Sequence, residues 1–248
     1  MSIESLIHFF QETFILREFL YQPLYNALVW LYDTVALQDL GLAIILLTVL
    51  VRLILYPLFH KTAKYQQLNQ ELRPELQKIK EKHKKDQEAQ VKATLELFRQ
   101  HKFNPAALMF LSLAQVPILF ALYVIFIGNI AQGLDLWLYS FTPRPEEFHQ
   151  TFFGLIDLTK ASAVVAVLAS LAQYFQARLT PAIVGAPGMK VIMLYFLPGL
   201  ILVFLLKFPA AVGLYWLTTT IFSIMQQVVV NRRFTKTPPP MPVGARKS

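Results

Sequence analysis

The fold is decided by one apolar run that contains a single charge: Gly41-Leu-Ala-Ile-Ile-Leu-Leu-Thr48-Val-Leu-Val-Arg52-Leu-Ile-Leu-Tyr-Pro57-Leu-Phe59. As a helix the run is long enough to cross a bilayer, which takes about 20 residues. On a continuous helix Arg52 lies about 12 Å from the basic flank at Lys61. A guanidinium at that depth costs at least about 2.5 kcal/mol. Either its side chain reaches back to the headgroups, or it belongs to a polar site inside the membrane.

The composition is that of an integral membrane protein. The 248 residues are 55% hydrophobic and 15% charged, whereas soluble domains carry about 25% charged residues. Mean hydropathy is +0.46. The chain has no cysteine, which excludes disulfides and thiolate metal sites. From its residues, the N-terminal region is expected to contain neither a cleavable signal nor a large folded outer domain.

Apolar segments predict five spans, at roughly 40–60, 106–130, 161–180, 190–206 and 210–230. The block between the first two spans holds eleven basic and six acidic residues, and the C-terminal tail is also basic. The 131–160 connection has only Arg144 and Lys160 as basic residues. Because basic loops stay inside, this block and the C-terminus are expected in the cytoplasm, with the N-terminus outside.

Two further segments are expected to be amphipathic helices. Phe19 to Val35 is rich in Tyr and Trp, which favours a helix lying on the outer membrane face. In 61–104, Leu and Ile recur every three or four residues, Pro74 is expected to kink or restart the first helix, and 82–88 is typical of a turn. This pattern predicts an antiparallel helical hairpin. It is either a solvated connector or a docking element for an acidic or RNA-bearing partner, or for anionic lipid.

The predicted fold class is therefore an all-α integral membrane protein with five transmembrane helices, a cytoplasmic antiparallel helical hairpin and an outer interfacial amphipathic helix. Its parts are an outer N-terminal region (1–38), transmembrane helix 1 (39–60), the basic hairpin (61–104), transmembrane helices 2–5 (105–231) and a disordered basic cytoplasmic tail (232–248).

The sequence contains none of the common motifs for covalent catalysis. There is no phosphate-binding loop, no His-Glu-x-x-His pair and no nucleophile elbow, and the expected spans contain almost no acids. His83 and His101 have no ligand partners at metal-binding spacing. We expect no enzyme activity, no cofactor and no metal site.

Uncharged polar residues are scattered through the expected spans instead. Each of them could simply hydrogen-bond a neighbouring helix, a contact worth about 0.6 kcal/mol. Together with Arg52, whose guanidinium has five donors, they could line one wet cavity. The set comprises Thr48, Gln115, Gln173, Gln176, Thr218, Thr219, Thr220, Gln226 and Gln227.

The order of motifs from Gly41 to Arg233 resembles the YidC membrane protein insertases and their organelle relatives. The motifs are Thr48-x-x-x-Arg52-x-x-Leu-x-Pro57-Leu58, Leu72-Arg-Pro74-Glu75, Asn104-Pro105, Gln115-Val-Pro117-Ile-Leu-Phe-Ala-Leu-Tyr123, Phe208-Pro209, Leu214-Tyr215-Trp216 and Gln226-Gln227. The chain departs from the family pattern at Leu108, Met109, Leu111, Ala211 and Thr220, which affects helix packing more than charge.

The resemblance implies an insertase that moves nascent membrane proteins into the bilayer through a hydrophilic groove, alone or beside the Sec translocon. Arg52 would be the charge of this groove. The other expected lining residues are Thr48, Gln115, Gln173, Gln176, Tyr215, Trp216, Thr219 and Gln226. The ribosome or the emerging chain would be received by Lys78, Lys80, Lys82, Lys84, Lys85, Arg232 and Arg233. No direct DNA binding is expected. The expected location is the bacterial plasma (inner) membrane.

Three other functions stay open at the level of sequence. A small transporter or channel could use Arg52 as an anion site, although the chain has no evident inverted repeat. A structural assembly factor or lipid scramblase would also use a polar groove facing lipid. A ribosome tether would need only the basic hairpin and would survive the loss of Arg52.

Overall fold

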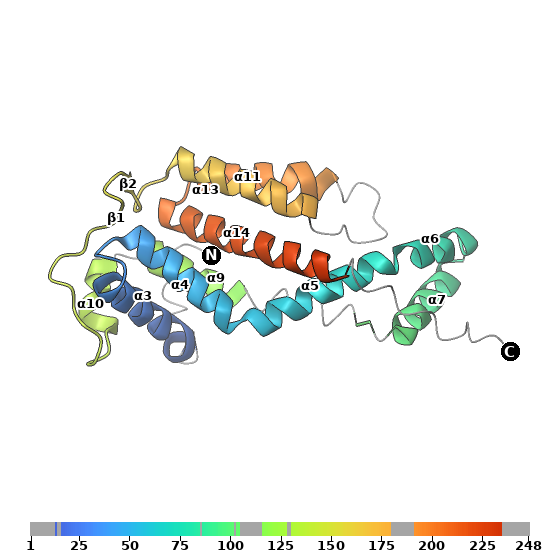
Figure 1. The fold of residues 1–248 in the computed structure, drawn as a ribbon, viewed down its shortest axis with the longest axis horizontal. Helices are drawn as coiled ribbons and strands as arrows, with labels where there is room; N and C mark the ends of the chain where they lie inside the picture. The colour runs from blue at the N-terminus through green and yellow to red at the C-terminus, as the bar shows by residue number, and fades with distance from the viewer. Residues whose placement is uncertain are drawn as a thin grey trace.

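The computed structural model describes residue 13 and residues 16–84, 86–101, 103–104, 116–127, 130–179 and 191–234. These are mostly helical (Figure 1). In chain order the elements are η1 (Arg17–Tyr21), α3 (Gln22–Thr34), α4 (Leu40–Ile54), α5 (Tyr56–Glu71), α6 (Arg73–Lys82), α7 (Gln87–Gln100), α9 (Val116–Ile127), α10 (Ile130–Trp137), β1 (Thr151–Phe152), β2 (Ile156–Asp157), α11 (Ala163–Leu179), η2 (Ile192–Phe196), α13 (Leu197–Leu205) and α14 (Ala210–Phe234).

Helix α14 lies in the middle of the molecule. In Figure 1 it runs between α11 and α13 on one side and α4 and α5 on the other. Gly213 of α14 packs so closely on α11 that an added Cβ would lie 2.8 Å from the Cγ1 atom of Val165. Ser170 of α11 donates a 2.8 Å hydrogen bond to the carbonyl of Pro198 in α13. Helix α14 is therefore in contact with both halves of the bundle.

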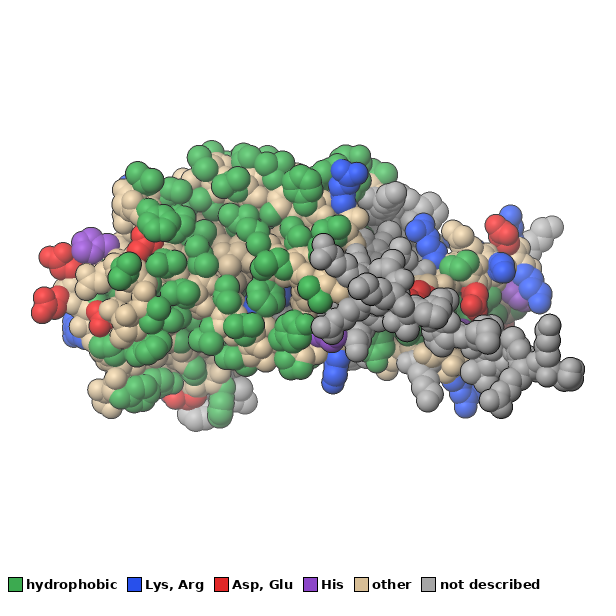
Figure 2. All heavy atoms as spheres, viewed as in Figure 1, with side chains coloured by type: hydrophobic (Ala, Val, Ile, Leu, Met, Phe, Trp, Pro, Cys, Tyr) green, Lys and Arg blue, Asp and Glu red, His purple; other side chains and the backbone are tan. Residues whose placement is uncertain are grey.

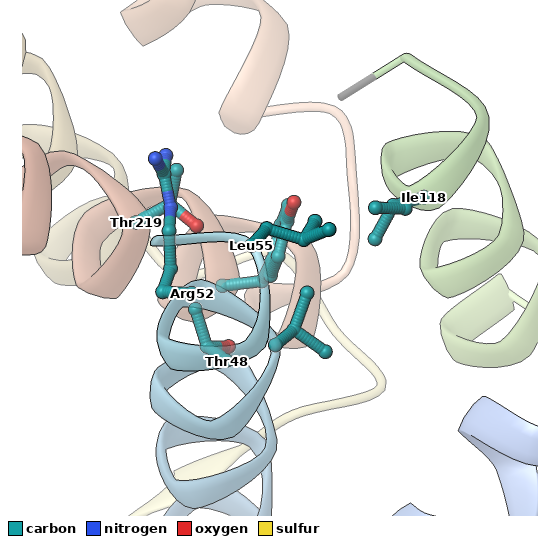
Figure 3. A pocket seen from close by; sticks show the side chains of 7 residues that line it. Thr48, Arg52, Leu55, Ile118 and Thr219 are labelled. Carbon is teal, nitrogen blue, oxygen red and sulfur yellow. The ribbon is translucent and has the colours of Figure 1, made fainter. Parts of the chain in front are cut away.

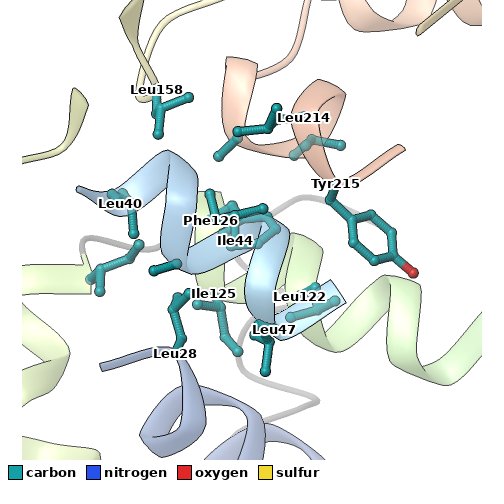
Figure 4. Close-up of a cluster of buried hydrophobic side chains, with 14 of the residues drawn as sticks. Leu28, Leu40, Ile44, Leu47, Leu122, Ile125, Phe126, Leu158, Leu214 and Tyr215 are labelled. Atoms are coloured by element: carbon teal, nitrogen blue, oxygen red, sulfur yellow. The ribbon is translucent and has the colours of Figure 1, made fainter. Parts of the chain in front are cut away.

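The main core forms around the first two-thirds of α4. Leu40, Ala43, Ile44 and Leu47 recur on one helical face, and none of them is more than 1% exposed. They pack against α3, α9 and α14 (Figure 4). This burial holds the upstream part of α4 in one place.

The helix expected over 40–60 is not continuous. Helix α4 ends at Ile54 and α5 begins at Tyr56, with a bend of 59° between Leu40–Ile54 and Tyr56–Thr62. Pro57 explains the break, because it has no backbone N–H and its ring clashes with the carbonyl four residues earlier. The depth estimated for Arg52 on a straight helix therefore does not hold.

The predicted helix near the N-terminus is present as α3, and it is far more buried than expected of a helix lying on a surface. Tyr25, Leu28, Val29 and Tyr32 are each at most 1% exposed and belong to the main core. Trp30, on the opposite side, is 47% exposed. A place at the membrane surface stays a prediction for this helix.

A second, smaller apolar cluster lies within the basic block. Leu72, Leu97 and Phe103 are its buried members, and they join α6 to α7. Helix α6 begins at Arg73 with Pro74 in its first turn, where the sequence predicts a kink or restart. Residues 83–86 connect the two helices, and the Asp86 side chain caps α7 by accepting from the N–H of Ala89.

No single helix in the described ranges is both long and apolar enough to cross a membrane. The bent pair of α4 with the start of α5 meets the length and composition together, and the segments Pro117–Ile127, Ala163–Leu179 and Ile192–Leu205 are shorter apolar helices. The described part also includes one small β-element that the all-α prediction lacks. Strands β1 and β2 pair antiparallel, Thr151 with Asp157 and Phe152 with Ile156.

Side-chain types are unevenly distributed on the surface. On the face shown in Figure 2, hydrophobic side chains cover most of the region of α4, α11, α13 and α14, whereas charged side chains gather mainly at the two ends. Exposed apolar residues occur along all four helices, and examples are Leu53, Leu171, Leu200 and Ile221. A belt of this kind is suited to a hydrocarbon environment.

Candidate functional site

Arg52 lines a small pocket where α4, α14 and α9 meet. The lining residues are Thr48, Val51 and Arg52 from α4, Leu55 directly after it, Tyr215 and Thr219 from α14, and Ile118 from α9. Figure 3 shows the Arg52 side chain extending from α4 toward Thr219. The cavity volume is about 10 Å³, room for about one water molecule. A charged side chain thus lies at the junction of three largely apolar helices.

Helical spacing brings these groups together. Thr48, Val51, Arg52 and Leu55 follow one another at intervals of three, one and three residues, so they share one face of α4. On α14, Tyr215 and Thr219 are four residues apart and share the face toward α4.

The polar groups of the site are deeply buried. Arg52 is 5% exposed, Thr48 is 1% exposed and Tyr215 is 3% exposed. The Thr48 hydroxyl donates to the carbonyl of Ile44 at 2.6 Å, which leaves its oxygen able to accept a further bond. Arg52 therefore has its guanidinium out of bulk water and close to neutral oxygen acceptors.

Two other buried polar atoms near this face make no hydrogen bond with any residue that the structure describes. They are the Thr219 Oγ1 and the Gln226 Nε2. The two residues are seven apart on α14, so they lie on the same side of that helix. A buried polar atom without a partner costs about 1–3 kcal/mol. Such atoms indicate a place that a polar ligand or water would occupy.

The apolar helices supply no negative charge to this site. The sequences of α4, α9, α11, α13 and α14 contain no Asp or Glu. Any carboxylate that meets Arg52 within this group of helices must therefore come from another segment or from another molecule.

The predicted groove residues divide into two groups. Thr48, Arg52, Tyr215 and Thr219 come together in the pocket. Trp216 turns toward α11 instead, where its Nε1 donates to the Gln173 Oε1 at 3.3 Å.

The remaining predicted groove residues are not among those that line the pocket. Gln176 is half-buried on α11. Gln226 is buried farther along α14. Gln115 lies outside the described residues.

Sequence reasoning did not select three of the pocket residues. Val51 and Leu55 could have been found from their spacing to Thr48 and Arg52 on one helical face. Ile118 lies within the 115–123 motif, but only the packing of α9 brings it to this position.

The basic residues predicted for ribosome contact lie away from the pocket. Lys78, Lys80, Lys82 and Lys84 are exposed along α6 and the turn that follows it. Lys85 lies outside the described residues. Arg232 and Arg233 are in the last turn of α14, where the structure describes the backbone alone.

The sequence matches the family model described as "60Kd inner membrane protein" over residues 30–237, which includes every residue of the pocket. The chain belongs to this family. Similar proteins are each named membrane protein insertase YidC. The one from Anaeromyxobacter sp. is 35% identical over 85% of this chain, and the one from Syntrophobacter fumaroxidans is 31% identical over 86%. The protein from Geobacter metallireducens is 30% identical over 85%.

This YidC-family chain matches only part of each relative. The matched region is 36% of the Anaeromyxobacter and Geobacter proteins and 38% of the Syntrophobacter protein. The family membership agrees with the resemblance seen in the motifs. It places Arg52 and its neighbours inside the part that these proteins share.

Proposed function

We propose that this chain inserts newly made membrane proteins into the bacterial plasma (inner) membrane, with Arg52 as the working charge of a hydrophilic groove. The observation that carries the proposal is the burial of Arg52, 5% exposed, among helices without acidic residues, in a chain of the YidC family. The insertase acts alone or together with the Sec translocon.

The role of Arg52 follows from the cost of moving a charge across hydrocarbon. A polar or acidic tail that must cross the membrane meets its largest barrier in the dry centre of the bilayer. A wet groove shortens that dry path. Arg52 attracts a carboxylate of the tail, and the oxygens of Thr48, Tyr215 and Thr219 accept hydrogen bonds from the tail's polar groups. The chain thus lowers the barrier without forming a covalent bond.

The apolar helix of the substrate would leave along α11 and α14. Leu171 and Phe175 of α11, and Ile221 and Met225 of α14, are between 45% and 55% exposed. Gln173 and Trp216 form a polar contact between the same two helices. Gln176 lies on α11 and Gln226 on α14, and both supply further amide groups along the path.

The basic block would meet the ribosome or the emerging chain. Lys78, Lys80, Lys82 and Lys84 present positive charge at one end of the molecule, and ribosomal RNA is polyanionic. Lys85, Arg232 and Arg233 are assigned to the same contact by sequence. In this orientation the 61–104 hairpin and the C-terminus are cytoplasmic, the N-terminus is outside, and five helices cross the membrane.

The test is insertion by the purified chain in lipid vesicles. A single-span substrate is offered, and protection of its tail from added protease is compared with vesicles that lack the chain. The proposal expects protection only with the chain. The same vesicles are assayed for anion flux and for lipid translocation, because a transporter or scramblase would give these signals without insertion. Binding of ribosomes without any protection would identify a tether and contradict the proposal.

A further inference from the structure

We propose that segment 151–160 is a positioning element that fixes α4 against α14, and so holds Arg52 opposite Tyr215 and Thr219. The inference rests on the proposed function only for its effect on insertion. The segment joins α4 and α14, the two helices that carry most of the pocket, near their first residues, Leu40 and Ala210.

Asp39 ties this segment to the start of α4. Its Oδ1 accepts a 2.8 Å hydrogen bond from the N–H of Leu42, which caps the helix. Its Oδ2 accepts from the backbone N–H of Phe153. One carboxylate therefore joins the first turn of α4 to a residue 114 positions away in the chain.

Gly41 brings α4 and the segment into direct contact. A Cβ at Gly41 would lie 2.1 Å from Cδ2 and 2.7 Å from Cβ of Phe152, distances that no side chain could tolerate. The Phe152 side chain thus occupies the space beside the α4 backbone. The turn that follows it holds Phe153 and Gly154 at positive φ, 48° and 67°, and positions the Phe153 N–H next to Asp39.

The other end of the same segment caps α14. The N–H of Ala210 donates to the carbonyl of Lys160 at 2.8 Å, and the N–H of Ala211 donates to the carbonyl of Leu158 at 3.1 Å. The first N–H groups of a helix have no partner within it, so these carbonyls satisfy donors that would otherwise be unpaired. Leu158 itself is 1% exposed in the main core.

Both helix starts are therefore attached to one short segment, which is itself held by the β1–β2 pairing. Arg52 lies about 18 Å along α4 from Leu40, and Thr219 lies about 14 Å along α14 from Ala210. Helices are stiff over such lengths, so a shift at their starts is carried to the pocket. Asp39 and Gly41 are positioning residues in this account, because Asp39 makes the link and Gly41 leaves room for it. They do not touch the substrate.

The test separates this contact from ordinary helix capping. Asp39→Asn keeps one side-chain oxygen for the Leu42 N–H. Its NH₂ group then faces the Phe153 N–H and cannot accept the second hydrogen bond. Asp86→Asn makes the same change at the cap of α7, which has no such second link in the described structure, and it is the matched control. Gly41→Ala displaces Phe152, and the double variant Gly41→Ala/Phe152→Ala removes the clash.

The readout is independent of insertion. The chain has no cysteine, so a single introduced cysteine can be labelled selectively. Thr219→Cys measures how accessible the pocket is to the labelling reagent. Val91→Cys, on the exposed side of α7, measures accessibility elsewhere in the molecule. We expect at least a threefold change in the rate of thiol labelling at position 219 in Asp39→Asn and Gly41→Ala. Labelling at position 91 should stay constant, Asp86→Asn should have no effect, and the double variant should regain most of the original rate.

Unchanged labelling at position 219 in both Asp39→Asn and Gly41→Ala would overturn the proposal, whatever happens to insertion. Changed labelling without rescue in the double variant would also overturn it, because the effect would then come from general loss of folding. Changed labelling with rescue, but with insertion unaffected, would support the positioning role and contradict the use of the pocket in insertion.

Discussion

The two ends of α4 meet very different surroundings. Upstream of the pocket, Ala43 and Ile44 are completely buried against α3, α9 and α14. Downstream of Arg52, Leu53 is 56% exposed and Ile54 is 66% exposed. The same apolar run thus changes from core to surface within three turns, and Arg52 lies where the change occurs. The apolar run is packed where α4 begins and exposed where it ends, which is the asymmetry that the proposed groove needs.

The largest expected effect is a difference in the free energy of unfolding between alanine variants of two isoleucines, one on either side of Arg52. Ile44→Ala should lower the free energy of unfolding by about 2–5 kcal/mol, because it leaves a cavity in the packed end. Ile54→Ala should change it by less than about 0.5 kcal/mol, since the side chain is mostly exposed. Reversible denaturation in detergent micelles measures both values. Equal losses would mean that the two ends are packed alike.

A second contrast concerns the polar contacts that close the packed end. The Asn26 side chain donates to the carbonyls of Gln22 and Trp137 at 2.8 Å. It also accepts from the Tyr139 N–H at 2.7 Å and the Thr142 hydroxyl at 2.8 Å.

Asn26→Ala should cost about 1–3 kcal/mol, because it leaves buried groups without partners. Asn26→Asp keeps the two accepted bonds and should also destabilise, because it sets a carboxylate against two carbonyls. Gln77→Ala on the exposed side of α6 is the control. Thermal unfolding and protease cleavage within 138–150 report the change, and stable, uncut Asn26 variants would refute the role of this contact.

The exposed lysines of α6 and of the turn after it should be replaceable without loss of stability. Replacing Lys78, Lys82 and Lys84 together with Gln should change the free energy of unfolding by less than about 0.5 kcal/mol, because these side chains are exposed. Ribosome binding should weaken, and its dependence on salt should become shallower, because fewer counterions are released. Sedimentation with ribosomes at several salt concentrations measures this. An equal effect of Arg144→Gln would contradict a contact specific to α6.

The smallest effect concerns pH and segment 151–160. The side-chain hydrogen bond from Lys160 is the main cause that lowers the pKa of Asp157 to about 2, assisted by the hydroxyl and N–H of Thr159. A lowered pKa stabilises the folded state above the ordinary value of 3.8, and this stabilisation is lost as the pH falls through about 2.

Hydrogen exchange of the 158–160 amides, corrected for intrinsic rates, should therefore give the same protection at pH 7 and pH 5 and lower protection at pH 3. Asp157→Asn should exchange faster at pH 7 and pH 5. Protection in the original chain that stays constant from pH 7 to pH 3 would show that this carboxylate titrates near its ordinary pKa, because a group with the same pKa in the folded and unfolded states gives no pH dependence.

Much of the architecture could be predicted from local sequence. Helix starts at Arg73 and Gln87 follow from Pro74 and from the capping side chain of Asp86. Helical spacing places Thr48 with Arg52 on one helix face and Tyr215 with Thr219 on another. The family resemblance, and not the spacing, brought the two pairs together. Their role in a groove is still a prediction.

Other features depend on contacts between distant segments, which periodicity does not contain. The break between α4 and α5 is an exception, because Pro57 is visible in the sequence and only the size of the bend needs the structure. The burial of α3 depends on bonds from Asn26 and Tyr32 to residues more than 100 positions away. Trp216 turns from Tyr215 toward Gln173 because neighbouring helical positions differ by about 100°.

The central claim is that Arg52 acts on the charge of the substrate's outer tail. The most direct measurement is a comparison of two substrates, one with an acidic tail and one with the same tail made neutral, in vesicles with the original chain, Arg52→Lys or Arg52→Ala. We predict that Arg52→Ala slows insertion of the acidic substrate about tenfold, equivalent to about 1.4 kcal/mol of barrier, and hardly affects the neutral one. Arg52→Lys should lie between them. An equal loss with both tails would contradict the claim.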